Sequence, residues 1–120
     1  MTHPTQLETA SNQQVPAAET TPVSLSVQLK DQIDYSKPGV TRKVLIKDQT
    51  SSFMLMCITA GTVLPEHTAP RNVSLTILEG YGCLTIEGKE VRLEAGVFVY
   101  MPANTPHSLR ADENLAFLHT

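Results

Sequence analysis

The sequence has no tryptophan and only 5% aromatic residues, and its 120 residues leave room for one hydrophobic core. It has no basic run and no interleaving of basic with aromatic residues, which argues against a nucleic-acid-binding surface. No window approaches the length of a membrane-spanning helix, and the N-terminus lacks the charged start, apolar run and cleavage site of a secretory signal. We therefore expect a cytoplasmic protein without a nucleic-acid or membrane partner.

Cysteine is also scarce. Cys57 and Cys83 lie inside apolar, strand-like segments, and neither belongs to a CxxC or a Cys/His pattern. Two such residues are weak evidence for a disulfide. Free cysteines are commonly buried as small core residues, so we assign this pair no chemistry.

The first 22 residues hold few large apolar side chains and many Thr, Gln, Ala, Pro and Ser. Such a segment cannot bury enough surface to offset the entropy cost of ordering the chain. We predict a disordered tail over residues 1–22 and one folded domain over residues 23–120. The domain would carry all nine Lys and Arg residues and ten of the twelve acidic residues, which is close to charge balance.

From Phe53 onward, short apolar runs alternate with Gly, Pro, Asn and Asp, a pattern typical of an all-β sandwich or barrel. The Glu-Gly and Ala-Gly pairs between the runs supply the positive-φ position that tight hairpins need. The expected strands are Val40–Ile46, Phe53–Thr59, Val73–Leu78, Tyr81–Ile86, Lys89–Leu93, Val97–Met101, His107–Ala111 and Leu115–His119.

An additional strand is expected upstream. Apolar residues fall at every second position over Val23–Ile33, and the segment 34–39 ends in Pro-Gly, which favours a reversal. An extra edge strand often serves as a dimer surface, because an open edge otherwise pairs without control. We therefore expect a homodimer.

Two segments share one arrangement, in which a glycine is followed by a proline-bearing turn and then a histidine. The first runs from Gly61 to His67, and the second runs from Gly96 to His107. The fixed φ of proline can hold each histidine rigidly. If strands carry both segments into one barrel, the two histidines can face the same cavity.

These segments resemble the paired motifs of the cupin superfamily, over Gly61 to Ala111. The first motif reads here as Gly61, His67, Ala69, Val73 and Gly80, and the second reads as Gly96, Pro102, Asn104, His107 and Ala111. The resemblance implies a double-stranded β-helix, or jelly-roll barrel. Asn104 stands where the family has a glycine, and asparagine can adopt the same left-handed conformation.

The resemblance also implies a place for a metal. In cupins that bind iron, manganese, nickel or zinc, two histidines and a glutamate from the first motif and a histidine from the second hold the ion. Those four places are His67, Ala69, Val73 and His107 in this chain, so two of them cannot coordinate a cation. Divalent catalytic sites generally have at least three protein ligands.

A third ligand has two candidates. Glu66 would point to the opposite face of a strand from its neighbour His67. His119 would lie opposite His107 in a simple hairpin, but the last strand of a cupin jelly roll crosses to the other sheet. His67 and His107 are thus the candidate metal ligands, for iron, manganese, nickel or zinc, and His119 is the weaker third candidate.

The predicted pocket is mostly apolar with a polar corner. Val73, Leu75 and Ile77 alternate along one strand face and, with Ala69, would line the interior. Such a pocket suits a small amphiphilic organic molecule whose carboxylate or carbonyl accepts hydrogen bonds from His67 and His107. Two more side chains complete the predicted site: Tyr100 could add a phenol, and Arg71 could pair with an anion at the mouth.

Two functions follow from this sequence. One is a binding barrel for a small organic ligand, with a divalent metal held weakly through the two histidines. The alternative is a metal-dependent enzyme of oxygenase or isomerase type that uses His67, His107 and a third ligand, or an acid-base enzyme without metal. A sensory module would normally bring an effector domain such as a helix-turn-helix, and none is evident. Whether the protein is an enzyme stays open at this point.

Overall fold

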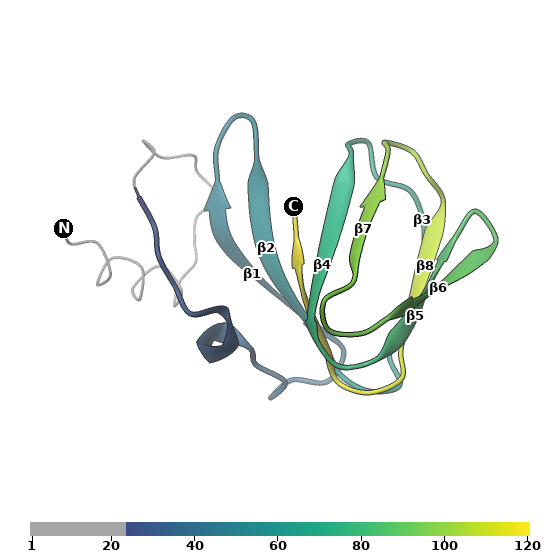
Figure 1. Ribbon diagram of the computed structural model, residues 1–120, viewed down its shortest axis with the longest axis horizontal. Coiled ribbons are helices and arrows are strands. Elements are labelled where there is room, and N and C mark those ends of the chain that lie inside the picture. The colour runs from purple at the N-terminus through teal and green to yellow at the C-terminus, as the bar shows by residue number, and fades with distance from the viewer. Residues whose placement is uncertain (1–23) are drawn as a thin grey trace.

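The computed structural model describes residues 24–120, which form two antiparallel β-sheets packed face to face (Figure 1). The tail predicted over residues 1–22 lies outside the described residues. The strands are β1 (Val40–Lys47), β2 (Ser52–Ile58), β3 (Val63–His67), β4 (Val73–Glu79), β5 (Gly82–Ile86), β6 (Lys89–Leu93), β7 (Phe98–Met101), β8 (His107–Ala111) and β9 (Leu115–His119).

The strand order identifies a jelly roll. One sheet has the order β1-β2-β9-β4-β7 and the other has the order β3-β8-β5-β6. All the strand pairs are antiparallel. Strands β8 and β9 are consecutive in the chain yet belong to different sheets, so the last strand crosses from one sheet to the other. The predicted all-β jelly-roll fold is confirmed. No helix within residues 24–120 is long and apolar enough to cross a membrane.

All eight strands expected from Val40 onward are present, with ends that differ by at most one residue. The ninth strand, β3, is missing from the sequence prediction because it contains Pro65. Proline cannot donate a ladder hydrogen bond, so a proline inside a short run argues against a strand. Here β3 is the edge strand of its sheet, and its register shifts between Leu64 and His67, which is where a proline is tolerated.

The additional strand predicted over Val23–Ile33 is wrong. Residues 24–28 have no regular structure, and Leu29–Gln32 forms a 3₁₀ turn, η1 (Figure 1). The apolar residues at the end of this segment pack on a sheet instead of pairing with an edge. Ile33 and Tyr35 cover the outer face of β2 and β9 at Leu55, Cys57 and Ala116, with Leu78 beside them.

Two polar contacts fasten this segment to the sheet. The hydroxyl of Tyr35 donates a hydrogen bond of 2.8 Å to Glu79, and the ammonium of Lys43 donates one of 2.7 Å to the carbonyl oxygen of Gln32. Burial raises the pKa of Tyr35, and the adjacent carboxylate of Glu79 raises it further, so the phenol stays protonated. The segment is therefore a fixed strap over the outer face of the five-stranded sheet.

The main core lies between the two sheets. Inward-facing residues alternate with outward-facing ones, as in β4, where Val73, Leu75 and Ile77 are buried and Ser74 and Thr76 are not. The fully or nearly fully buried core includes Ile58, Ile77, Leu84, Leu93, Met101, Leu115 and Phe117. The turns predicted from Gly and Asn also form: Asn104 has a φ of 67°, which is the left-handed conformation that its place in the motif requires.

Candidate functional site

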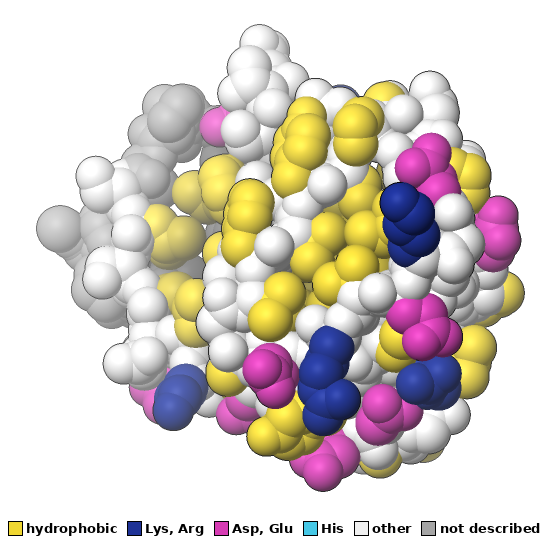
Figure 2. Space-filling model, turned by 45° about the vertical axis from the view of Figure 1, so that its right-hand side comes forward, with side chains coloured by type: hydrophobic (Ala, Val, Ile, Leu, Met, Phe, Trp, Pro, Cys, Tyr) yellow, Lys and Arg dark blue, Asp and Glu magenta, His cyan; other side chains and the backbone are white. Residues whose placement is uncertain are grey.

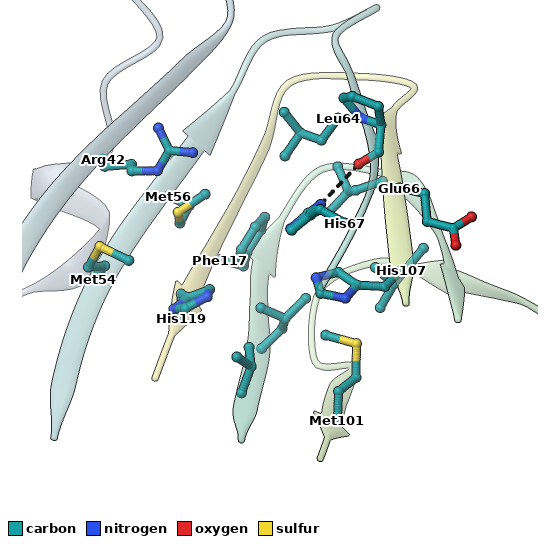
Figure 3. A pocket seen from close by; sticks show the side chains of 15 residues that line it. Arg42, Met54, Met56, Leu64, Glu66, His67, Met101, His107, Phe117 and His119 are labelled. Atoms are coloured by element: carbon teal, nitrogen blue, oxygen red, sulfur yellow. Dashed lines mark hydrogen bonds between the residues drawn. The ribbon is translucent and has the colours of Figure 1, made fainter. Parts of the chain in front are cut away.

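A cavity of about 390 Å³ opens between the two sheets (Figure 3). Its wall comes from eight of the nine strands, all but β6, and from both sheets. The polar lining residues are Arg42, Glu66, His67, His107 and His119, and the apolar ones are Met54, Met56, Leu64, Pro65, Val73, Leu75, Leu84, Met101, Leu109 and Phe117. The cavity is therefore apolar over most of its wall, with a few polar groups contributed by both sheets.

His67 and His107 come together as cross-strand partners. His67 ends β3, and His107 begins β8 directly opposite it. Directly opposed residues of antiparallel strands project to the same face, so both rings face the cavity. The ring centroids lie 4.3 Å apart, and the ring planes are inclined by 57°.

Each ring is held by the backbone two residues before it. Nδ1 of His67 lies 2.9 Å from the carbonyl oxygen of Pro65, and Nδ1 of His107 lies 2.8 Å from that of Thr105 (Figure 3 draws the first contact). A carbonyl oxygen can only accept, so Nδ1 carries the proton in both rings. Each Nε2 makes no hydrogen bond within residues 24–120 and, in the neutral ring, keeps a lone pair for a ligand.

His119 reaches the same cavity from the opposite sheet. It ends β9, next to Met54 of β2 and Leu75 of β4. Burial lowers the pKa of His119 below its ordinary value, and the nearby charge of Arg42 adds to the effect. This imidazole is therefore neutral at physiological pH.

A third metal ligand is not in place. Glu66 neighbours His67 along β3, and its carboxylate points away from the two histidines (Figure 3). In the described part of the chain, no three His, Cys, Asp or Glu side chains gather closely enough to hold a metal ion. The donor set of two histidines therefore does not complete the three-ligand site that divalent catalytic metals generally have.

Among the predicted pocket residues, His67, Val73, Leu75 and His107 line the cavity. Ile77 projects to the same face of β4 as Leu75, but it lies two residues farther along the strand and is enclosed by the core. Tyr100 points outward and is 55% exposed, because the inward positions of β7 are Val99 and Met101. The prediction of a phenol in the pocket is thus wrong.

The loop after β3 supplies none of the lining. Ala69 packs against the main core from this loop, and its carbonyl oxygen accepts a hydrogen bond from the backbone N–H of Asn104. Arg71 is exposed in the same loop and is not part of the cavity wall. The prediction that Ala69 lines the pocket and that Arg71 stands at its mouth is therefore wrong, because both residues belong to this loop and not to a strand of the cavity wall.

Sequence reasoning missed Arg42. It lies on β1 opposite Met56, and it shares the inward face with Val40, which packs on the core. The alternation of Val40, Arg42 and Val44 was visible in the sequence, but nothing there indicated that β1 would pair with β2 and extend the cavity wall.

A family model for the cupin domain matches residues 54–120, more than half of the chain. The chain is a cupin. Among curated proteins, none matches it.

Solved structures agree on the fold of this cupin. A conserved protein of unknown function from Streptococcus pyogenes is 22% identical, covers 88% of this chain and 92% of its own, and has a TM-score of 0.72. A cupin superfamily protein from Desulfitobacterium hafniense is 17% identical, covers 86% and 95%, and has a TM-score of 0.73.

One similar structure is an enzyme. The salicylate 1,2-dioxygenase from Pseudaminobacter salicylatoxidans is 20% identical over 75% of this chain, with a TM-score of 0.61. The match covers only 28% of that enzyme. At these identities the likeness extends to the fold alone, because one fold supports many unrelated functions.

Proposed function

We propose that this cupin binds a small organic molecule, with an apolar body and a polar end, in the cavity between its sheets. One observation carries the proposal: a mostly apolar cavity of about 390 Å³ is lined by two imidazoles whose Nδ1 atoms are fixed by backbone carbonyls and whose Nε2 atoms make no hydrogen bond within residues 24–120. Cavities of this size lined by apolar side chains, with a few convergent polar groups, are typical of small-molecule sites.

The two imidazoles suit a hydroxyl, carbonyl or carboxylate. A neutral Nε2 accepts a hydrogen bond from a hydroxyl, and a protonated one donates to a carbonyl or carboxylate oxygen. The backbone carbonyls that hold Nδ1 fix both rings before the ligand arrives. This arrangement reduces the ordering cost of binding.

The test is a thermal-shift screen of the full chain against small acids, sugars and aromatic amphiphiles. A ligand at 100 times its dissociation constant stabilises the native state by about 2.7 kcal/mol, so hits should raise the unfolding temperature. The double variant H67A/H107A should lose the shift, and Arg71→Gln, at an exposed loop residue outside the cavity wall, should keep it. A screen without hits, or equal binding by the histidine variant, contradicts the proposal.

A metal-dependent enzyme is the second candidate, and one observation favours it: two adjacent imidazoles line a single cavity, and neither Nε2 makes a hydrogen bond within residues 24–120. Iron, manganese, nickel or zinc would act there as a Lewis acid or redox centre. The ion would need a further ligand beyond the two histidines, because the described residues do not supply one. Metal analysis of untagged protein checks this, since less than stoichiometric metal and no binding on titration would exclude it.

We also propose that the chain forms a homodimer through an apolar part of its surface. Figure 2 shows hydrophobic side chains gathered at the centre of one face, with charged side chains around its lower and right-hand margins. The edge strand β7 exposes Phe98 and Tyr100 by 63% and 55%. Light scattering should give twice the chain mass, and the double variant F98S/Y100S should shift it to the monomer. A monomeric wild type contradicts the proposal.

A further inference from the structure

We infer that the ligand of this cavity is an organic anion, a small monocarboxylate with an apolar body, and that Arg42 binds its carboxylate. This inference rests on the proposed small-molecule function and adds the chemical class of the ligand. It is carried by an arginine that faces an apolar cavity with no acidic partner among the described residues.

The position of Arg42 follows from the register of two strands. Arg42 of β1 is the direct partner of Met56 of β2, so both side chains project to the cavity side of the sheet. Figure 3 shows the guanidinium extending from β1 over the cavity, on the side of Met56 and His119. Arg42 is exposed on an edge strand, so the guanidinium borders both the cavity and the solvent.

The charge of this guanidinium is not compensated within residues 24–120. The ion pairs there use Arg92 with Glu94 and Arg110 with Asp112, and no carboxylate pairs with Arg42. Guanidinium groups stay protonated in proteins. The acidic residue of the wall, Glu66, belongs to the other sheet, and its carboxylate points away from the histidines (Figure 3).

An apolar wall strengthens the attraction between Arg42 and an anion. Arg42 is exposed, so water partly screens its charge, but the apolar wall at Met54, Met56 and Phe117 excludes water from one side and makes its attraction for an anion stronger than on an open surface. The planar fork of arginine can donate two parallel hydrogen bonds to a carboxylate. His119 lies near this place as an uncharged imidazole, because burial and the charge of Arg42 lower its pKa.

The arrangement also orients the ligand. Arg42 and His119 belong to the five-stranded sheet, whereas His67 and His107 belong to the four-stranded sheet. A ligand with its carboxylate at Arg42 would pass its apolar body over Phe117 and Leu75, both part of the wall. Its far end would meet the histidine pair, so a second small polar group there is compatible with the site.

The test compares matched acids and amides: benzoate with benzamide, and hexanoate with hexanamide, titrated calorimetrically into the full chain. Each amide keeps the shape of its acid and lacks the charge. We expect each acid to bind at least tenfold more tightly than its amide. Arg42→Gln should abolish this preference, and Arg42→Lys should keep part of it, because an ammonium retains the charge without the fork.

Arg71→Gln is the matched control, since Arg71 is an exposed arginine outside the cavity wall, and it should leave the preference unchanged. Thermal unfolding of Arg42→Gln and Arg42→Lys verifies that both variants fold. Equal binding of acids and amides, or a preference that survives in Arg42→Gln, overturns the inference while leaving the small-molecule function standing. If neither acids nor amides bind, the inference is overturned, and a screen without any hit overturns the proposed function as well.

Discussion

The two ends of this sandwich use the same strands for different purposes. At one end, Ile77 of β4, Ala111 of β8 and Leu115 of β9 are almost completely buried. At the other end, β8 begins with the partly exposed His107 and β9 ends with the partly exposed His119, and both line the cavity. We call the end with Ile77, Ala111 and Leu115 the closed end and the end with His107 and His119 the open end. The inward-facing positions of one strand thus build the core at the closed end and the candidate site at the open end.

One turn at each end shows a difference in local packing. At the closed end, the turn at Gly80 presses against the turn between β8 and β9, and a Cβ on Gly80 would lie 1.9 Å from the carbonyl oxygen of Asn114. At the open end, the β5–β6 hairpin tip projects freely, and a Cβ on Gly88 would meet nothing within 4 Å. Gly80 therefore has no room for a side chain, whereas Gly88 has.

The largest expected effect comes from alanine at these two glycines. Both have positive φ, 95° at Gly80 and 85° at Gly88, which costs a side chain about 1–2 kcal/mol. Gly80→Ala adds an overlap with backbone atoms that no rotamer can relieve, so we expect it to lose more than about 4 kcal/mol of unfolding free energy. Gly88→Ala should lose only the conformational cost.

Urea unfolding followed by circular dichroism measures both variants. If Gly80→Ala has the circular dichroism spectrum of the native protein, urea unfolding gives its loss of stability directly. Failure of this variant to fold is the extreme of the same result. Similar losses in the two variants would show that the closed end is no tighter than the open end.

Truncation within β4 tests the same comparison inside the core. Ile77 is enclosed by the core, whereas Leu75, two residues away on the same face, lines the cavity. Ile77→Ala should cost about 3–4 kcal/mol because it leaves a closed void, and Leu75→Ala should cost less because it enlarges an existing cavity that water can enter. Urea unfolding decides, and a larger loss at Leu75 contradicts the assignment of the two ends.

The open end should also tolerate a new metal-coordinating carboxylate side chain. Val73 lines the cavity with the histidines and occupies the place where metal-binding cupins have glutamate. Val73→Glu should raise the affinity for Zn²⁺ or Mn²⁺ at least tenfold, about 1.4 kcal/mol, because it supplies the missing carboxylate. Val73→Gln is the neutral control. Chelator competition measures the gain, and equal affinity in both variants means that residue 73 does not reach the histidines.

The closed end was readable from the sequence, and the open end only in part. The apolar alternation over Val73–Leu78 and the short continuous apolar run over Leu115–His119 both predicted core strands, because burial on one or both faces imposes these patterns. The strand β3 was not predicted, because it contains Pro65. The alternation over Val23–Ile33 predicted a strand, but this segment forms a 3₁₀ turn and packs on the outer face of the five-stranded sheet. The local pattern of apolar residues indicates which segments are buried, but it does not indicate which segments pair with one another.

The same limit applied to the site. His67 and His107 were found because their spacing matches a family motif, and their cross-strand contact follows from β3 and β8. Arg42 was missed because its approach to the cavity depends on β1 joining β2, a pairing between segments that carry no motif. Tyr100 was misplaced because its position in the chain was close to His107, although the alternation of β7 turns it outward.

The smallest expected effect is a pH dependence that originates at the open end. Burial lowers the pKa of His119 in the folded state below its ordinary value of 6.5, so the unfolded chain binds a proton more readily. Unfolding free energy should therefore fall as the pH is lowered below about 6.5, and the loss should end below the folded-state pKa. Urea midpoints between neutral and mildly acidic pH should show this slope in the wild type, and His119→Gln should flatten it. An unchanged slope in the variant would show that another group causes the pH dependence and that the buried imidazole of His119 does not affect stability.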